Sequence, residues 1–193
     1  MGLRPQEVAV RDWVKTQVSP RRFAHIQGVA RSAEALARRH GQSVEKCRLA
    51  AWLHDAAKEY TRARMLQCLK GSPFRLDPLE QKMPGLWHPH AGAALALKRW
   101  KIKDREVLEA IRCHTLGGEK MGPVAQVVFV ADFIEPGRAF KGLVRARRAA
   151  RESLVKGVRA KAEMTLGHLL QAGHLIHPRL VLTYNAFLEK DFK

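Results

Sequence analysis

The sequence predicts an all-α protein, a compact helical bundle of a single domain. Apolar residues recur at three- and four-residue steps along most of the chain, which is the period of a helix with one buried face. Capping residues, prolines and glycines mark off helix-length segments, and patterns typical of strands are scarce. The 193 residues suffice for one domain with a substantial core, and neither an internal repeat nor a low-complexity linker divides them.

The first three helices are expected between clear start and stop signals. One runs from near Pro5 to Val18, and Ser19-Pro20 then supplies an N-cap and a proline for the first turn of the second. Gly41 ends the second helix, whose inward stripe carries a histidine. Ser43 can cap the third helix, which delivers His54-Asp55.

The middle of the chain predicts shorter elements. Thr61 to Leu69 is typical of a short helix, and Gly71 ends it. Asp77-Pro78-Leu79-Glu80 has the cap, the proline and the acidic first turn of another brief helix. We expect the segment from Gly85 to His90 to form a turn that leads into an alanine-rich helix from Ala91 to Trp100.

A nearly continuous apolar run from Val124 to Ile134 follows a helix that Asp104 caps and that Gly117-Gly118 ends. Taken alone, the run could be a buried strand. A helix is favoured, because Pro123 starts it, Pro136 follows it, and no other strand is evident to pair with it.

The remainder of the chain is predicted to be helical. One helix is expected from Leu143 to Val155 and a further one ending near Gly173. Pro178 opens a last helix, which carries Leu180, Val181, Tyr184 and Leu188.

Excess positive charge is the strongest feature of the composition, with a formal net charge of +17. It indicates an anionic partner such as a nucleic acid, a nucleotide polyphosphate or an acidic lipid, without distinguishing among them. Lysines and arginines gather in residues 98–105 and 145–151, and such clusters are more often solvated helix surface than binding sites.

The sequence predicts a cytoplasmic protein with reduced thiols. No apolar run approaches the roughly 20 residues that cross a bilayer, and residues 1–14 carry charges where a signal peptide needs an apolar stretch. Cys47, Cys68 and Cys113 are far apart and form no CxxC pair, so neither a disulfide framework nor a zinc knuckle is indicated.

An imidazole followed at once by a carboxylate, His54-Asp55, interrupts an apolar helix face that Cys47, Ala50 and Ala51 share. A buried histidine and aspartate are costly unless they are paired, hydrogen-bonded or bound to a cation. Taken alone, the dipeptide is better explained as a satisfied core histidine beside an exposed aspartate. The rest of the chain changes that balance.

Further imidazoles and carboxylates lie on helix faces that should point inward. The set comprises His25, His54, Asp55, His114 and Asp132, with His88 just before a helix. So many ionisable groups in one small core are hard to satisfy without a cation. Imidazole and carboxylate ligands suit zinc, iron, manganese or nickel better than calcium or magnesium, and they are enough for two metals that share one carboxylate.

This order of residues resembles the HD-domain superfamily of metal-dependent phosphohydrolases, whose signature is a histidine, a His-Asp pair and a distant aspartate. Here these are His25, His54-Asp55 and Asp132. Longer motifs are similar to those of one bacterial family, the YqeK-type symmetrical bis(5'-nucleosyl)-tetraphosphatases. They are RFAHIQGV at 22–29, LHDAAKE at 53–59, IRCHT at 111–115 and FVADFIEPGR at 129–138.

The resemblance covers roughly Ser19 to Leu188 and implies a small all-helical cytoplasmic enzyme that binds iron and cuts diadenosine tetraphosphate into two ADP. It implies a single HD domain over 1–193, with a core of about 19–140 and the helices of 141–193 packed on it. The cofactor would be one or two iron ions, with manganese, zinc or another transition metal as alternatives. The sequence leaves homodimer formation open.

By the same resemblance, a first metal would be bound by His25, His54, Asp55 and Asp132, and His88 and His114 would complete a second site that Asp55 bridges. The family usually has His-Gly-Pro where this chain has His88-Pro89-His90, so either histidine could face the metal.

The expected reaction is attack of metal-activated hydroxide on the tetraphosphate bridge, with Asp55 and Lys58 as catalytic residues. Lys58, Arg138, His88 and His114 would bind the substrate, and the guanidinium fork suits phosphate. Lys58 could equally be an ordinary surface lysine.

Three alternatives remain at this point. Another HD phosphohydrolase, such as a nucleotidase, a deoxynucleotide triphosphohydrolase or a cyclic-dinucleotide phosphodiesterase, would use the same ligands. A basic nucleic-acid-binding protein would explain the charge, although the sequence has no recognisable reading motif and this alternative is not favoured. A catalytically inactive scaffold has no need of six buried polar groups.

Overall fold

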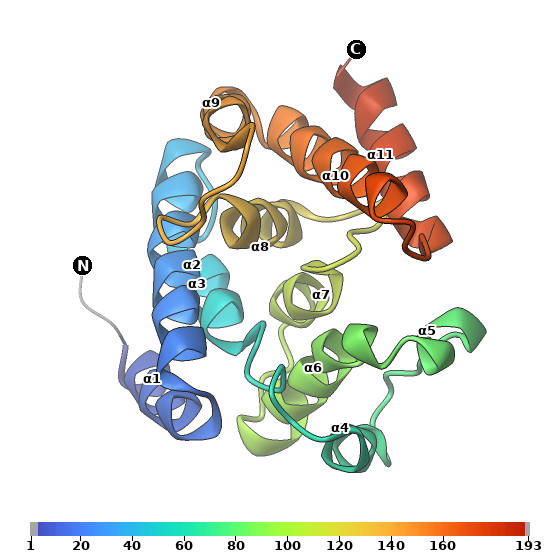
Figure 1. The fold of residues 1–193 in the computed structure, drawn as a ribbon. Coiled ribbons are helices and arrows are strands. Elements are labelled where there is room, and N and C mark those ends of the chain that lie inside the picture. The colour runs from blue at the N-terminus through green and yellow to red at the C-terminus, as the bar shows by residue number, and fades with distance from the viewer. Residues whose placement is uncertain (1–3, 192–193) are drawn as a thin grey trace.

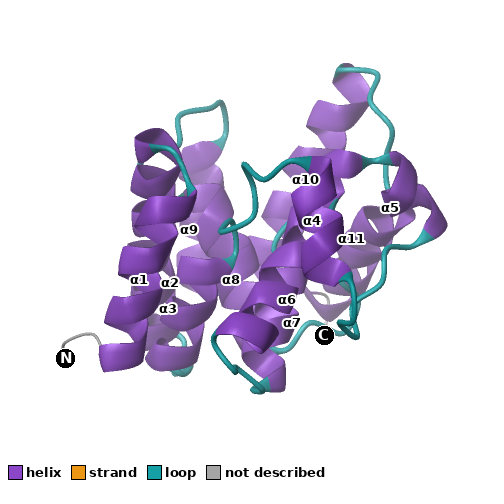
Figure 2. Cartoon of the chain, turned by 90° about the horizontal axis from the view of Figure 1, so that it is seen from below, coloured by secondary structure: helices purple, strands orange, loops and turns teal. Residues whose placement is uncertain are grey.

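A computed structural model describes residues 4–191, so the ends of the predicted 1–193 domain, residues 1–3 and 192–193, lie outside the described residues. The described helices are α1 (Pro5–Gln17), α2 (Pro20–Arg39), α3 (Val44–Leu53), α4 (Arg62–Leu69), α5 (Pro78–Lys82), the 3-10 turn η1 (Pro84–Leu86), α6 (His88–Arg99), α7 (Arg105–Cys113), α8 (Pro123–Ile134), α9 (Leu143–Glu152), α10 (Leu154–Gln171) and α11 (Pro178–Asp191). Helices and loops account for this whole part of the chain, with no strand (Figure 2). The all-α prediction is confirmed.

Helix α8 lies in the middle of the bundle (Figure 1) and contacts α2, α3, α7, α9 and α10. It is apolar over most of its surface, and residues such as Val127, Val128 and Phe129 have no exposed surface. A helix surrounded by other helices buries its whole circumference, which explains an apolar run without helical periodicity. The choice of helix over strand for Val124 to Ile134 is confirmed.

The predicted caps start their helices. The side chains of Ser19 and Ser43 each accept a hydrogen bond from a backbone N–H in the first turn of α2 and α3, and Thr61, which the sequence placed inside its helix, does so as the cap of α4. Asp77 and Asp104 do the same for α5 and α7. Such a cap satisfies backbone donors that the helix cannot pair, and its removal typically costs about 1 kcal/mol.

Two element boundaries differ from the sequence predictions in ways that affect the site. The third helix ends at Leu53, so His54 is its C-cap and Asp55 lies in the turns that follow. Helix α6 begins at His88 and not at Ala91, because Pro89 occupies its first turn, where a proline loses no hydrogen bond.

In the C-terminal region, a single helix from Leu143 to Val155 is wrong. Ser153 has extended backbone angles, and its side chain accepts a hydrogen bond from the N–H of Val155, so it separates α9 from α10. Helix α10 packs against α8, α9 and α11. Along α11 the buried face carries Leu180 and Phe187, whereas Val181 is 39% exposed. None of the helices within residues 4–191 has the length and apolar character that a membrane crossing needs.

Candidate metal centre

Asp55 stands at the middle of a cluster of imidazoles. Its Oδ1 lies 3.3 Å from Nε2 of His88 and 3.4 Å from Nε2 of His114. Its Oδ2 lies 3.7 Å from Nε2 of His54 and 3.8 Å from Nε2 of His25. Each oxygen of one buried carboxylate therefore faces its own pair of imidazoles.

Asp132, from α8, closes the cluster on the His25 side. Its Oδ1 lies 3.2 Å from Nε2 of His25 and 4.0 Å from Nε2 of His54. The structure thus brings together side chains from α2, α6, α8 and the segments that follow α3 and α7. All six side chains that the sequence predicts as metal ligands meet here: His25, His54, Asp55, His88, His114 and Asp132.

Three of the imidazoles are held by backbone carbonyls through the ring nitrogen that faces away from Asp55. Nδ1 of His54 donates to the carbonyl of residue 51 at 2.6 Å, and Nδ1 of His114 to that of residue 111 at 2.8 Å. Nδ1 of His88 donates to the carbonyl of Gly85 at 2.8 Å. A carbonyl only accepts, so each Nδ1 carries the proton and each Nε2 presents a lone pair to the cluster.

The fourth imidazole, His25, is held by a buried carboxylate. Its Nδ1 lies 3.1 Å from Oε1 of Glu135, which is 4% exposed. Glu135 also accepts a hydrogen bond at 2.6 Å from the N–H of Gly137 through its other oxygen. A carboxylate behind a ligating histidine orients the ring and makes its second nitrogen a better ligand.

The cluster has the donors and the spacing of a metal site. Nε2 of His25 and Nε2 of His54 are buried and have no hydrogen-bond partner within residues 4–191, which is costly unless a cation satisfies them. Bonds of about 2.1 Å put two ligands of one ion about 3.0 Å apart at a right angle and about 4.2 Å apart when opposite. The separations from Asp55 and Asp132 lie in this range, and two overlapping groups form, His25-His54-Asp55 and Asp55-His88-His114.

Burial keeps most of the imidazoles neutral and therefore able to bind a metal. It lowers the pKa of His54 to about 4, although Asp55 acts in the opposite direction. Burial likewise lowers the pKa of His88 and of His114. His25 differs: burial is the largest influence and lowers its pKa, but the nearby carboxylates outweigh it and the net shift is upward.

The two central carboxylates stay ionised. Burial, the largest influence, acts to raise the pKa of Asp55, but His54, His114 and His88 outweigh it and the pKa falls well below its usual value. Burial also acts against ionisation of Asp132, and the Lys161 ammonium outweighs it, so that pKa is lowered too. The site therefore has negative oxygens available for a cation at neutral pH.

Four cationic side chains surround the two carboxylates. Arg22 Nη1 lies 2.9 Å from Oδ2 of Asp55, and Arg138 Nη2 lies 3.0 Å from Oδ1 of Asp132. Lys161 Nζ donates to Oδ2 of Asp132 at 2.9 Å. Half-buried Lys58 has its Nζ 3.3 Å from Nε2 of His88, so it faces the cluster and is not an ordinary surface lysine.

The sequence reasoning missed Arg22, Glu135 and Lys161 as members of this site. Arg22 and Glu135 stand within the quoted motifs, so their positions beside the signature residues were a usable signal. Lys161 lies seven residues after buried Leu154 and three after buried Val158, which is the spacing of an inward helix face, where a lysine is unusual.

Of the two candidate histidines, the structure places His88 beside Asp55. His90 Nε2 lies 2.9 Å from Oε1 of Glu80, away from Asp55. Two residues along a helix are about 200° apart, so the two histidines point to opposite sides of α6.

A cavity of about 1000 Å³ opens from the cluster toward α10. That volume lies at the upper end of small-molecule sites, so the cavity has room for a ligand larger than phosphate. Lys58 and Arg138 line it near the carboxylates, and Phe133 of α8 and Phe140 and Lys141 of the loop before α9 also line it. Cations and aromatic rings together suit an aromatic polyanion.

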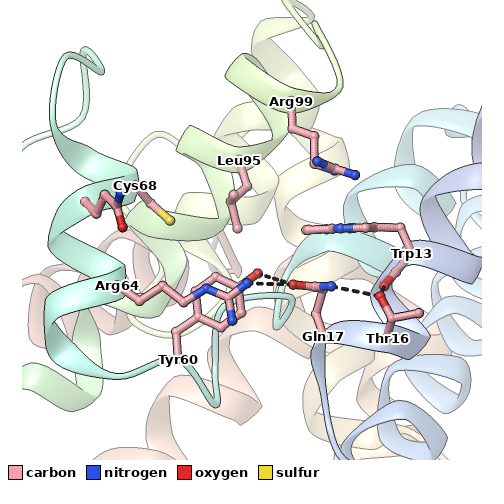
Figure 3. Close-up of a pocket in the computed structure, with 9 residues that line it drawn as sticks. Trp13, Thr16, Gln17, Tyr60, Arg64, Cys68, Leu95 and Arg99 are labelled. Carbon is pink, nitrogen blue, oxygen red and sulfur yellow. Dashed lines mark hydrogen bonds between the residues drawn. The ribbon is translucent and has the colours of Figure 1, made fainter.

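A second hollow, of about 650 Å³, lies between α1, α4 and α6 (Figure 3). Arg64 stacks on the Tyr60 ring there, and Gln17 accepts hydrogen bonds from both side chains. Exposed Arg99 lies over Trp13 on the opposite wall. None of the described residues that line the hollow is a histidine or a carboxylate, and none of them belongs to the metal centre.

A further group of potential ligands, Asp77, Glu80 and His177, is already occupied by a cationic side chain. Arg179 lies 3.1 Å from Asp77 and 3.0 Å from Glu80, and it joins α11 to α5. The geometry of these ion pairs indicates a structural role, which is to hold α11 against α5.

Comparison with known proteins agrees with the geometry. The family model described as HD domain matches residues 22–137, which include the whole set of His and Asp side chains in the cluster. The chain belongs to the HD-domain family. It is an enzyme of that hydrolase group, whose members depend on a metal.

Curated relatives of this HD protein are named bis(5'-nucleosyl)-tetraphosphatase, symmetrical. The protein of Bacillus subtilis is 34% identical over 89% of this chain and 92% of its own length, and that of Halalkalibacterium halodurans is 33% identical over 91% and 93%. A crystal structure from Clostridium acetobutylicum, described as a predicted HD superfamily hydrolase involved in NAD metabolism, covers 98% of this chain with 29% identity and a TM-score of 0.90.

Proposed function

We propose that this HD protein hydrolyses diadenosine tetraphosphate symmetrically, giving two ADP. The observation that carries the proposal is one carboxylate, Asp55, that faces two pairs of imidazoles at the end of a large cationic cavity. The names of relatives that match nine-tenths of the chain support the choice of substrate.

We propose His25, His54, Asp55 and Asp132 as the ligands of one metal, and Asp55, His88 and His114 as the ligands of a second. Iron is the ion that we propose, because imidazole and carboxylate donors without a thiolate suit it, and manganese is the nearest substitute. A bound metal would lower the pKa of water and neutralise phosphate charge.

The protein's own groups would position the tetraphosphate. The half-buried Lys58 side chain lines the cavity with its ammonium beside His88. The Arg138 side chain is 40% exposed and lines the same cavity beside Asp132. Both can donate to phosphate oxygens, and charge-assisted bonds of this kind are the strong ones. Phosphoryl transfer needs mainly such positioning and charge neutralisation.

The reaction consumes one water. Its oxygen forms a bond to the second or third phosphorus of the bridge, the oxygen between those two phosphorus atoms leaves with the other ADP, and the two protons of water end on the products or the solvent. Hydrolysis in H₂¹⁸O should therefore label one of every two ADP molecules.

The test is a product assay with metal-loaded protein and diadenosine tetraphosphate. ADP alone supports the proposal, whereas AMP with ATP, or turnover of mononucleotides only, contradicts it. His88→Gln should abolish most of the activity. His90→Gln is the matched control, because His90 lies in the same helix two residues later and its imidazole contacts Glu80 and not Asp55.

Nucleic-acid binding by the basic surface and homodimer formation are two further properties that experiments can test. Nucleic-acid binding is not favoured, and a salt-dependent affinity for RNA that survives loss of the metal ligands would be its signature. Homodimer formation is measured by light scattering.

A further inference from the structure

Lys161 is a buried lysine of α10 whose ammonium is fully used. The residue is 5% exposed. Its Nζ donates to the backbone carbonyls of His114 and Phe129, each at 2.8 Å, and to Oδ2 of Asp132 at 2.9 Å. An ammonium has three N–H donors, so all three are satisfied, each by a different oxygen.

These bonds fix the ammonium from three directions. The carbonyl of His114 lies at the C-terminal end of α7, and the carbonyl of Phe129 lies in the middle of α8. The Phe129 ring centroid lies 4.1 Å from Nζ. A buried ammonium is tolerated only with this degree of pairing, and a group held on every side has little freedom to move.

The two oxygens of Asp132 consequently have separate partners. Oδ2 accepts from Lys161, while Oδ1 faces Nε2 of His25 at 3.2 Å and Nε2 of His54 at 4.0 Å. Arg138 also touches Oδ1, but it is 40% exposed and approaches from the cavity, so it can turn to a substrate. Lys161 has no such alternative.

We propose that Lys161 is a positioning residue of the metal centre: it holds Oδ2 of Asp132 so that Oδ1 is presented to the cation beside His25 and His54. Lys161 lies outside residues 22–137, which match the HD family, so the C-terminal helices complete the centre as well as packing on it. The inference rests on the proposed metal site and adds the residue that orients one of its ligands.

A merely structural role makes a different prediction. Lys161 also joins α10 to α7 and α8, so its loss lowers stability in either case. Only a positioning role also weakens metal binding, and only through Asp132. Metal affinity is therefore the informative measurement.

The experiment measures binding of Mn²⁺ to metal-stripped protein by the electron paramagnetic resonance signal of the free ion. Lys161→Met should weaken binding by about 10- to 100-fold, the usual effect of losing a group that orients a ligand. Val158→Ala is the matched control, because this fully buried α10 residue belongs to the apolar core and offers no polar atom to the cluster. It should lower the melting temperature and leave the Mn²⁺ affinity within twofold.

A second comparison separates the mechanism from misfolding. In an Asp132→Asn background, Lys161→Gln should change the Mn²⁺ affinity by less than threefold, although Lys161→Gln alone weakens it at least tenfold, because coupled residues are non-additive. Equal effects in both backgrounds, or wild-type affinity in Lys161→Met, overturn the inference. A wild-type protein that binds no Mn²⁺ overturns the proposed function instead.

Discussion

Gly28→Ala tests the link between the buried carboxylate of Glu135 and the metal centre. Gly28 lies inside α2, where alanine is normally the better helix former by up to about 1 kcal/mol. A methyl group at this position would lie 2.3 Å from Oε2 and 3.2 Å from Cδ of Glu135. Helix propensity and packing thus predict opposite results.

The size of the displacement follows from these distances. Ordinary contacts begin near 3.4 Å, so the carboxylate must move by about 1 Å. Its bond to Nδ1 of His25 is 3.1 Å long, and such a shift away from the ring takes it beyond hydrogen-bond range. Loss of the group that orients a ligating histidine weakens metal binding by about 10- to 100-fold, or about 1.4–2.7 kcal/mol.

The assay has two readouts, Mn²⁺ affinity and the free energy of unfolding in urea without metal. For Gly28→Ala we expect the weaker affinity just given and no gain in stability, since overpacking costs about 1–3 kcal/mol. Gly167→Ala is the control: it lies in α10 with nothing within 4 Å of the added methyl, so stability should rise by up to about 1 kcal/mol at unchanged Mn²⁺ affinity. A Gly28→Ala protein that is stabilised like the control and binds Mn²⁺ normally refutes the reasoning.

Three further predictions concern substrate binding, pH and stability. Lys58→Ala should lower kcat/KM for diadenosine tetraphosphate by about 10- to 100-fold, the value of a hydrogen bond to a charged group, with unchanged Mn²⁺ affinity; an equal loss of Mn²⁺ affinity would show a structural role. In metal-free protein the folded pKa of His54 is about 4 against 6.5 unfolded, so the unfolded state binds more protons between these values and stability falls as the pH drops through that window. His54→Phe should reduce the fall between pH 7 and pH 4.5 by about 2 kcal/mol in urea unfolding, and an unchanged fall would assign it to other groups. Arg48→Met should lower the free energy of unfolding by about 3–5 kcal/mol, because it leaves Glu7, 1% exposed, as an unpaired buried charge; a loss below 1 kcal/mol, like that of exposed Arg38→Met, would contradict this.

Local chemistry explains why most helices were predictable. Ser19, Ser43 and Asp104 each mark a helix start by a side-chain oxygen that accepts from the first turn, and this signal is contained in a few residues. Ser153 gives the same signal, but the apolar spacing continues through it, so the break between α9 and α10 was missed. Periodicity cannot show where two consecutive helices change direction.

Convergence of the cluster was inferable because an ionisable group on an apolar face needs a partner, as at His25, His54 and Asp132. The contacts of Glu135 with His25 and of Lys161 with Asp132 could not be inferred from the sequence, because they depend on how α2, α8 and α10 pack together. Which of two nearby histidines faces Asp55 depends on the residue at which α6 begins, and helix boundaries are the least certain part of a sequence-based prediction.

Cations are expected to bind between Asp55 and the four imidazole Nε2 atoms. Anomalous X-ray diffraction at the absorption edge of iron or manganese, on crystals of metal-loaded protein, would locate them. We expect a peak about 2 Å from Nε2 of His25 and His54, and a second beside His88 and His114, with Asp55 between them. No peak within the cluster, or a peak only at the Asp77-Glu80-His177 group, would contradict this expectation.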